Sequence, residues 1–153
     1  MTDQTTDSTH QNTNTNQNED CVFCKIIDGT IPAYKIYEDD ETLAILDINP
    51  TNYGHTLVIP KDHTENIYTI SAELLCRLTL TVQKIAVAMR NGTDVDGINI
   101  IMNNESAAGQ IIKHAHIHVI PRLNDDGLMH WPHKEYKEGE MKTYQDKIKA
   151  ELQ

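Results

Sequence analysis

The stretch His114-Ala-His-Ile-His-Val-Ile120 alternates imidazoles with small or aliphatic side chains, and Pro121 follows it. A period of two residues is typical of a β-strand, so we predict a strand here. A second apolar run, Ile98-Asn-Ile-Ile-Met102, precedes it, and residues 103–113 between the two runs are few enough for a hairpin-type return. The two predicted strands should therefore lie antiparallel in one sheet.

The remaining regular elements lie upstream of this pair. Ser71 is a suitable N-cap for a long helix that Gly92 ends, and apolar residues recur between them at helical spacing. Three further strands are predicted at residues 35–38, 42–47 and 55–59, with a turn at 39–41 and a stop at Pro60. The expected fold is α+β: a five-stranded antiparallel sheet packed with one long helix.

Composition divides the chain into three parts. Met1 is the single apolar residue of positions 1–18, and such a segment cannot bury enough surface to offset its conformational entropy. We predict a disordered polar tail at residues 1–20, one folded domain at residues 21–132 and a C-terminal extension at residues 133–153. The extension is mixed and charged, and we expect a short helix within residues 136–152.

The overall composition limits the class of protein. Among 153 residues, 23 acidic side chains outnumber 13 basic ones, which gives a formal charge of −10. This balance argues against a partner that is a nucleic-acid polymer. No apolar run approaches the roughly 18 residues of a membrane span, and we identify no export signal. The cysteines number three, so we expect reduced thiols and a cytoplasmic location.

The three histidines of the predicted fifth strand carry the chemistry. Side chains alternate faces along a strand, so His114, His116 and His118 should lie on one side, with successive residues about 6.6–6.8 Å apart. Residues 115, 117 and 119 should then face the core. Three imidazoles on one face favour a functional site over a packed core. Two interpretations are open here: the histidines ligate one metal ion, or one is a nucleophile that its neighbours orient.

Other segments bear on this choice. They are Phe23-Cys-Lys-Ile-Ile27, Leu46-Asp-Ile48, Gly54-His-Thr-Leu-Val-Ile-Pro-Lys61, and Gly109-Gln110 leading into the His114–Ile120 stretch. In this order they resemble the histidine triad family of nucleotide hydrolases and transferases, across residues 21–132. The triad alone is a fairly specific motif, and the whole set is very specific.

The resemblance implies an enzyme and assigns roles to the triad. His116 would be the nucleophile that attacks the α-phosphorus of a purine nucleotide conjugate: a nucleoside phosphoramidate, an acyl-adenylate or a dinucleoside polyphosphate. Water would then resolve the nucleotidyl-histidine intermediate to a nucleoside monophosphate. His118 would hold phosphate oxygens and assist proton transfer to the leaving group, and His114 would orient its neighbour. The transferase branch has glutamine at the position of His118, so hydrolysis is favoured here.

The resemblance also implies a nucleoside pocket. Asp47 would accept hydrogen bonds from the ribose hydroxyls, and His55 would bond to a triad histidine. Apolar residues would enclose the base, and the loop before the triad would contact the phosphate and leaving group. The residues are Phe23, Ile26 and Ile48 for the base, and Asn103, Gly109 and Gln110 for the phosphate side. For Ile26, ordinary core packing is an equally good interpretation.

Three residues depart from the family pattern. Ile111 stands where a phosphate-binding Ser or Thr is frequent, Lys113 replaces an aromatic or apolar residue, and Ala115 replaces a larger aliphatic one. These changes bear on the choice of leaving group and on the rate, and they leave the basic chemistry intact.

A second group of residues suits a metal ion. Cys21 and Cys24 form a CxxC pair, a spacing found in zinc sites and also in pairs of buried thiols. A redox role fits less well, because no thioredoxin-like βαβ pattern follows. Bacterial relatives and the related uridylyltransferases complete such a pair with two histidines around structural zinc. Here these would be His63 and His114. Cys76, inside the long helix, is expected to be a buried bystander.

The segment Met129-His-Trp-Pro132 resembles one that reaches toward the partner subunit's active site in the Hint branch of the family. We therefore expect a homodimer. Two other functions stay open: a metallohydrolase whose three histidines bind a catalytic metal, and a nucleotide-binding regulator without activity. The metallohydrolase would also need a carboxylate ligand near the triad, and the sequence does not place one.

Overall fold

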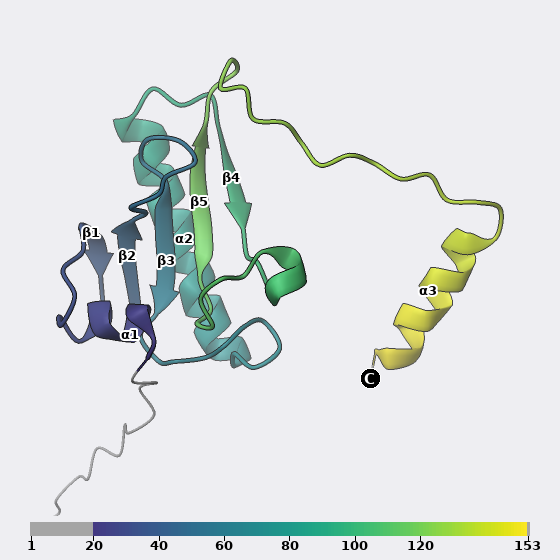
Figure 1. The fold of residues 1–153 in the computed structure, drawn as a ribbon, viewed down its shortest axis with the longest axis horizontal. Helices are drawn as coiled ribbons and strands as arrows, with labels where there is room; N and C mark the ends of the chain where they lie inside the picture. Colours follow the sequence, from purple (N-terminus) through teal and green to yellow (C-terminus); the bar gives the residue numbers. More distant parts are fainter. Residues whose placement is uncertain (1–19, 153) are drawn as a thin grey trace, which may run out of the picture.

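The computed structural model describes residues 20–152 (Figure 1). The tail predicted at residues 1–20 therefore lies outside the described residues, except for Asp20. In chain order, the elements are α1 (Val22–Ile27), β1 (Lys35–Glu38), β2 (Thr42–Leu46), β3 (Thr56–Pro60), α2 (Ala72–Gly92), β4 (Gly97–Ile101), the 3-10 turn η1 (Ser106–Ala108), β5 (Ile117–Arg122) and α3 (Glu140–Glu151). In this part of the chain, no helix is both long and apolar enough to cross a membrane.

The strands form one antiparallel sheet in the order β1-β2-β3-β5-β4. The α+β fold with five antiparallel strands and one long helix is confirmed. The predicted fifth strand, however, was placed too early: β5 begins at Ile117 and continues through Pro121 to Arg122. Pro121 is tolerated because the pairing with β3 ends at Val119, so its missing N–H costs no ladder bond on that side.

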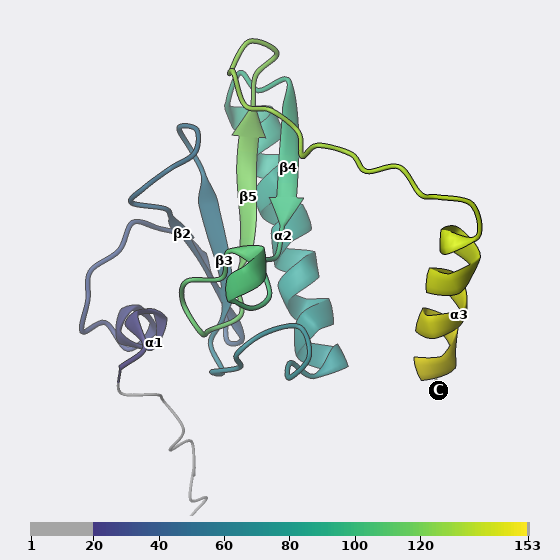
Figure 2. The same ribbon diagram turned by 45° about the vertical axis from the view of Figure 1, so that its right-hand side comes forward.

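The two faces of the sheet are covered differently. Helix α2 begins at the Ser71 cap, whose Oγ accepts the Leu74 N–H at 3.2 Å. Its buried side chains pack on residues of β2, β3 and β5: Leu78, Val82, Ile85 and Met89 lie against Ala44, Val58, Ile117 and Val119. On the opposite face, the short helix α1 covers part of β2 and β3 (Figure 2). As predicted, Ala115, Ile117 and Val119 are buried.

Strand alternation decides where the triad lies. His118 is the register partner of Leu57 on β3, and Leu57 belongs to the core under α1. The His118 side chain therefore emerges on the α1 face, away from the long helix. His114 and His116 precede the ladder, because the Ala115 N–H bonds to the Thr64 carbonyl at 2.7 Å rather than to a strand.

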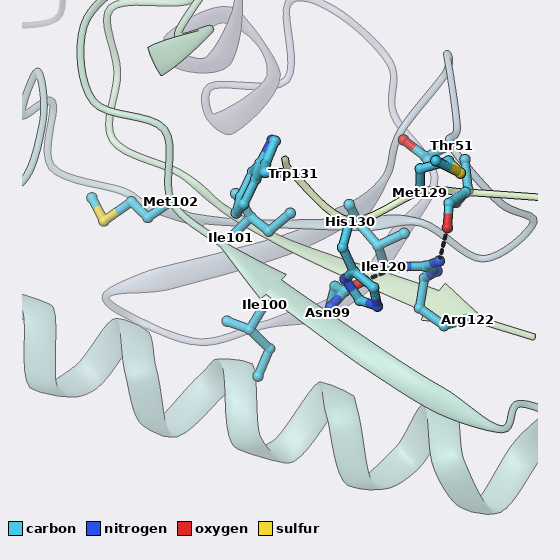
Figure 3. Close-up of a pocket in the computed structure, with 11 residues that line it drawn as sticks. Thr51, Asn99, Ile100, Ile101, Met102, Ile120, Arg122, Met129, His130 and Trp131 are labelled. Atoms are coloured by element: carbon cyan, nitrogen blue, oxygen red, sulfur yellow. Dashed lines mark hydrogen bonds between the residues drawn. The ribbon is translucent and has the colours of Figure 1, made fainter. Parts of the chain in front are cut away.

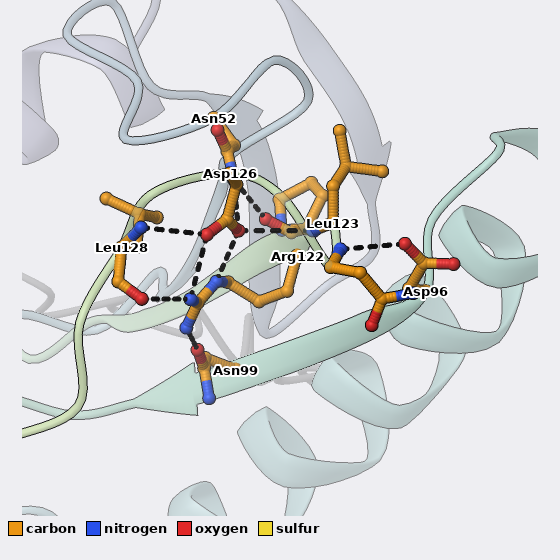
Figure 4. Close-up of polar contacts among 9 residues, drawn as sticks. Asn52, Asp96, Asn99, Arg122, Leu123, Asp126 and Leu128 are labelled. Carbon is orange, nitrogen blue, oxygen red and sulfur yellow. Dashed lines mark hydrogen bonds and ion pairs between the residues drawn. The ribbon is translucent and has the colours of Figure 1, made fainter.

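An ion-pair network closes the end of β5 (Figure 4). Arg122 donates two hydrogen bonds to the Asp126 carboxylate, at 2.7 and 3.0 Å, and this contact holds the pKa of Asp126 well below its usual range. Asn52 Nδ2 donates to Asp126 Oδ2 at 3.0 Å and to the Pro121 carbonyl at 2.9 Å. The network thereby fixes the loop at residues 47–55 to the end of β5, next to the triad.

The chain beyond Gly127 leaves the sheet and ends in α3, which stands apart from the rest of the fold (Figure 1). Helix α3 lies inside the stretch where we predict a short helix. Its apolar residues Met141, Tyr144 and Ile148, and Leu152 just after it, are all exposed. Their spacing of three or four residues places them on one side of the helix.

Candidate functional site

A cavity of about 500 Å³ opens on the α1 face of the sheet. It is bounded by α1, β2, the loop at residues 47–55, the loop at residues 103–112 and two of the triad histidines, His116 and His118. Nine of the residues predicted for the site line this cavity: Phe23, Ile26, Asp47, Ile48, His55, Asn103, Gly109, His116 and His118. Residues that are far apart in the sequence are thus brought to one place.

The tautomer of His116 follows from its hydrogen bond. Its Nδ1 lies 2.7 Å from the His114 carbonyl oxygen, and because a carbonyl can only accept, Nδ1 must carry the hydrogen. The Nε2 atom then holds a lone pair. The Phe23 ring meets the His116 ring edge to face, with centroids 5.1 Å apart. The imidazole is thus held in one orientation with a nucleophilic nitrogen available.

A second chain of hydrogen bonds fixes His55 and His118. The Thr51 backbone N–H donates to His55 Nδ1 at 3.2 Å, so His55 carries its hydrogen on Nε2. That nitrogen lies 2.9 Å from His118 Nδ1, which must accept. His118 therefore carries its own hydrogen on Nε2, which is the opposite tautomer to that of His116, whose hydrogen is on Nδ1. One imidazole of the cavity presents a lone pair, and its neighbour presents an N–H.

The electrostatics keep these imidazoles neutral near pH 7. Burial lowers the pKa of His118 to about 4, and the nearby His116 and His55 act in the same direction. Burial also lowers the pKa of His116, although its bond to the His114 carbonyl and the Asp47 charge oppose the change. The Asp47 carboxylate lies 3.6 Å from His55 Nδ1. A neutral imidazole keeps the lone pair that nucleophilic attack requires.

Four donors meet in a separate buried cluster beneath α1. The side chains of Cys21, Cys24, His63 and His114 place their ligand atoms within 4.8 Å of one another. His114 Nδ1 lies 3.4 Å from Cys21 Sγ, and His63 Nδ1 lies 3.3 Å from Cys24 Sγ. His114 Nε2 donates to the Pro60 carbonyl at 2.8 Å, so its Nδ1 lone pair faces the thiols. Two thiols and two imidazole nitrogens in this arrangement suit a tetrahedral metal ion.

The triad does not converge on one point. His114 belongs to the thiol cluster, while His116 and His118 line the cavity. Among the described residues, a second group with metal-ligand atoms within 4.8 Å is Asp47, His55 and His118. The arrangement needed by the three-histidine metallohydrolase is therefore not formed, although Asp47 is the carboxylate near the triad that the sequence could not place.

Gln110 lies apart from the predicted contacts. It is buried, and its Nε2 donates to the carbonyls of Glu65 and Ile112 at 2.7 and 3.1 Å. Its Oε1 accepts the Glu105 N–H at 2.7 Å. Through these hydrogen bonds, the Gln110 side chain connects the loop before the triad to the loop after β3. Cys76 also differs from expectation, because it is exposed on α2 rather than buried.

The sequence did not point to the Thr51 amide. Residues 49–54 are recognisable as a loop, but a backbone N–H carries no residue-specific signal. Thr51 also lines a neighbouring hollow of about 500 Å³ (Figure 3). Its other walls are β4, β5 and the segment at residues 128–131, which includes Trp131. The segment resembling a partner-directed arm thus lies beside the triad cavity of its own chain.

Comparison with known proteins places this geometry in a family. The family model described as "HIT domain" matches residues 28–125. The chain is 50% identical to protein hit of Bacillus subtilis over 104 residues, which are 68% of this chain and 72% of that protein. It is 46% identical to adenylylsulfatase HINT3 of Arabidopsis thaliana, over 71% of this chain and 55% of that protein. It is 36% identical to adenosine 5'-monophosphoramidase hnt1 of Schizosaccharomyces pombe, over 86% and 98% of the respective lengths.

Solved structures agree with the sequence relatives. A HIT family protein from Bacillus subtilis superposes with a TM-score of 0.82 at 42% identity, covering 88% of this chain and 99% of that one. A zinc-bound histidine triad family protein from Mycobacterium smegmatis superposes with a TM-score of 0.70 at 44% identity, covering 76% and 84%. The fold, the triad and these matches agree, and the chain belongs to the HIT domain family.

Proposed function

We propose that this protein is a nucleotide hydrolase that cleaves the α-phosphate bond of purine nucleotide conjugates through a nucleotidyl-histidine intermediate. The observation that carries the proposal is the opposite tautomers of two adjacent imidazoles: the bond to the His114 carbonyl leaves a lone pair on His116, and the bond from His55 leaves an N–H on His118. A nucleophile and a proton donor side by side are what displacement at phosphorus needs. Relatives named for adenylylsulfatase and monophosphoramidase activities support it.

The proposed reaction has two balanced steps. In the first, His116 Nε2 forms a bond to the α-phosphorus while the bond to the leaving group breaks. The His118 Nε2 proton passes to the leaving atom, and a proton from the solvent replaces it, so that His118 stays neutral. In the second, water attacks the phosphorus, the N–P bond to His116 breaks, and the proton lost by the attacking water returns to the solvent. The products are the free leaving group and a nucleoside monophosphate. Both imidazoles return to their starting states.

The nucleoside would occupy the α1 end of the cavity. Phe23 and Ile26 are buried at its back, and Ile48 is exposed at its rim. Asp47 accepts the Asn49 N–H at 2.8 Å, which leaves acceptor capacity on its carboxylate for ribose hydroxyls. Asn103 and Gly109 lie toward the phosphate side, whereas we now assign Gln110 to holding their loop in place.

We further propose that the buried cluster binds structural zinc through Cys21, Cys24, His63 and His114. The support is its donor set and the zinc-bound relative from Mycobacterium smegmatis. The ion would connect α1, the loop after β3 and the segment that leads into β5. Thiolate ligands must stay reduced, which accords with our expectation of a cytoplasmic protein.

The role of His55 gives the first prediction. His55→Leu removes the donor that fixes the His118 tautomer, so kcat should fall about 100-fold. Because proton donation matters most for poor leaving groups, the loss should be larger for an alkylamine phosphoramidate than for one with an acidic, nitrophenol-like leaving group. His55→Gln, which retains an N–H donor, should lose less. Steady-state kinetics on both substrates measure this.

His133→Leu is the control for the His55 variants, since His133 is exposed and does not line the cavity. An equal loss with both leaving groups would mean that His55 serves only to support the fold.

We also propose that the protein is a homodimer, formed through the β4 edge of the sheet. β4 is an edge strand, and unpaired edges invite pairing with another chain. An apolar groove runs between it and α2, lined by Val82, Ala86, Val87 and Ile100, among others. The isolated apolar side of α3 is a second surface that a partner subunit would cover.

The dimer is tested with a charge on each edge of the sheet. Ile100 on β4 is 55% exposed and Ile36 on the opposite edge strand β1 is 47% exposed. Ile100→Lys should weaken the dimer about 30-fold, whereas Ile36→Lys should not. Sedimentation over a concentration series measures both. A monomeric wild type, or a dimer that tolerates both substitutions, would contradict this interface.

A further inference from the structure

One rim of the triad cavity is an exposed isoleucine. Ile111 is 92% exposed, although it lines the cavity that contains His116 and His118. Its position is imposed by its neighbours: the Gln110 side chain bonds to the Ile112 carbonyl, across Ile111, and to the Glu65 carbonyl. The backbone is thus fixed with the aliphatic side chain turned outward. Burying apolar surface is favourable in free energy, so a large aliphatic side chain that is exposed at the mouth of a cavity favours binding of a ligand that covers it.

The charges that line the cavity also favour an uncharged group of the ligand at this rim. Among the described residues, no lysine or arginine lines it. The Asp47 carboxylate contributes a negative charge to its lining. The cation nearest in sequence to the rim residue, Lys113, has a side chain that is 81% exposed and is paired with Glu65 at 3.0 Å.

Among the described residues, a lining with one carboxylate and no cation distinguishes between the candidate substrates by the charge that each one carries. A phosphoramidate or acyl-adenylate brings one negative charge, carried by the oxygens of its α-phosphate, to which imidazole and backbone N–H groups can donate hydrogen bonds. A dinucleoside polyphosphate places further charges beyond the α-phosphate, where the cavity offers no cation among its described lining residues. The Ile111 side chain at the rim offers such charges no hydrogen-bond donor.

We infer that Ile111 is a specificity-determining residue and that the site selects nucleotide conjugates with an uncharged, apolar leaving group over charged leaving groups and polyphosphates. The inference rests on the proposed function, because it concerns the leaving group of that reaction. It follows from the exposed side chain of Ile111 together with the absence of cations among the described residues of the cavity.

The test compares two substrates that differ in one charge. They are the adenosine 5′-phosphoramidates of phenethylamine and of 4-(2-aminoethyl)benzoate, with diadenosine tetraphosphate as a third substrate. The wild type should favour the uncharged amine by about tenfold in kcat/KM, and cleave the polyphosphate more slowly still. Ile111→Lys should reduce this ratio about tenfold, and Ile111→Ser should reduce it by a smaller factor. Ile36→Lys, which adds the same charge at an exposed isoleucine outside the cavity, should leave the ratio unchanged.

The outcomes are distinct. If the wild type cleaves the charged and uncharged amines equally well, or if Ile111→Lys keeps the wild-type ratio, the inference is wrong while the hydrolase proposal stands. If none of the conjugates is cleaved, the proposed function is wrong, and the inference, which depends on it, is wrong as well. A lowered ratio in Ile111→Lys but not in Ile36→Lys supports the inference.

Discussion

Replacing His116 with alanine should lower single-turnover cleavage of an adenosine phosphoramidate by about 10⁴-fold. His116 presents a lone pair to the cavity, because its Nδ1 hydrogen is committed to the His114 carbonyl. The adjacent His118 presents an N–H instead, so it cannot replace the nucleophile without losing its role as proton donor. Intact-protein mass spectrometry during the reaction should show a transient adenylate adduct on the wild type and none on the variant.

The pH dependence gives a second measurement of the same nucleophile. Because burial lowers the pKa of His116 from its ordinary value near 6.5, the imidazole stays neutral as the pH falls through 6.5. The wild-type kcat/KM should therefore remain constant to a lower pH than a free imidazole would allow, and then fall as His116 takes up a proton. His133→Ala, at an exposed histidine, serves as the control and should keep both adduct and turnover.

The same experiment separates the competing functions. Turnover without an adduct, abolished by a chelator, would favour a metallohydrolase and contradict our proposal. Adenosine nucleotide binding with neither adduct nor turnover would favour a regulator. The position of His114 already weighs against a three-histidine metal site, because its Nδ1 lies 3.4 Å from Cys21 Sγ in the separate cluster.

The sequence predicts the elements of the fold well and their side-chain partners only in part. Alternation placed His118 on one face and Ile117 and Val119 in the core, because these residues belong to a regular strand. The start of the strand was predicted too early, since the Ala115 N–H bonds to the Thr64 carbonyl and keeps residues 114–116 out of the ladder before Ile117. Periodicity reports on local geometry, and this bond joins residues 51 positions apart.

Polar contacts to the backbone were the least predictable part of the site. The amide of Gln110 is chemically suited to a phosphate, and only the fold shows that its donors and acceptor are taken by Glu65, Glu105 and Ile112. The Thr51 backbone N–H sets the tautomers of His55 and His118. The type of residue at position 51 does not reveal this contact, because nearly every residue has a backbone N–H. Cys76 was predicted to be buried and is exposed on α2. The apolar pattern of a helix predicts which side packs on the sheet, but it does not decide the burial of each single residue.

Removing one thiol of the buried cluster should cause the largest loss of stability. Cys24→Ser should lose bound zinc and lower the free energy of unfolding by about 3 kcal/mol, which lowers the midpoint of thermal unfolding by about 10 °C for a domain of this size. Zinc content by elemental mass spectrometry and unfolding by circular dichroism measure the two effects. Cys76→Ser is the matched control, since Cys76 is exposed on α2, and it should change neither.

The size of this effect follows from what the cluster connects. Helix α1 spans six residues, too few to be stable by itself, and it carries Phe23, whose ring lies 5.1 Å from that of His116. His114 carries the carbonyl that fixes the His116 tautomer. Loss of the metal should therefore loosen both the base pocket and the nucleophile, so that Cys24→Ser loses kcat as well as stability. Equal zinc content in Cys24→Ser and the wild type, or an unchanged unfolding midpoint, would show that the cluster is a pair of buried thiols beside two histidines.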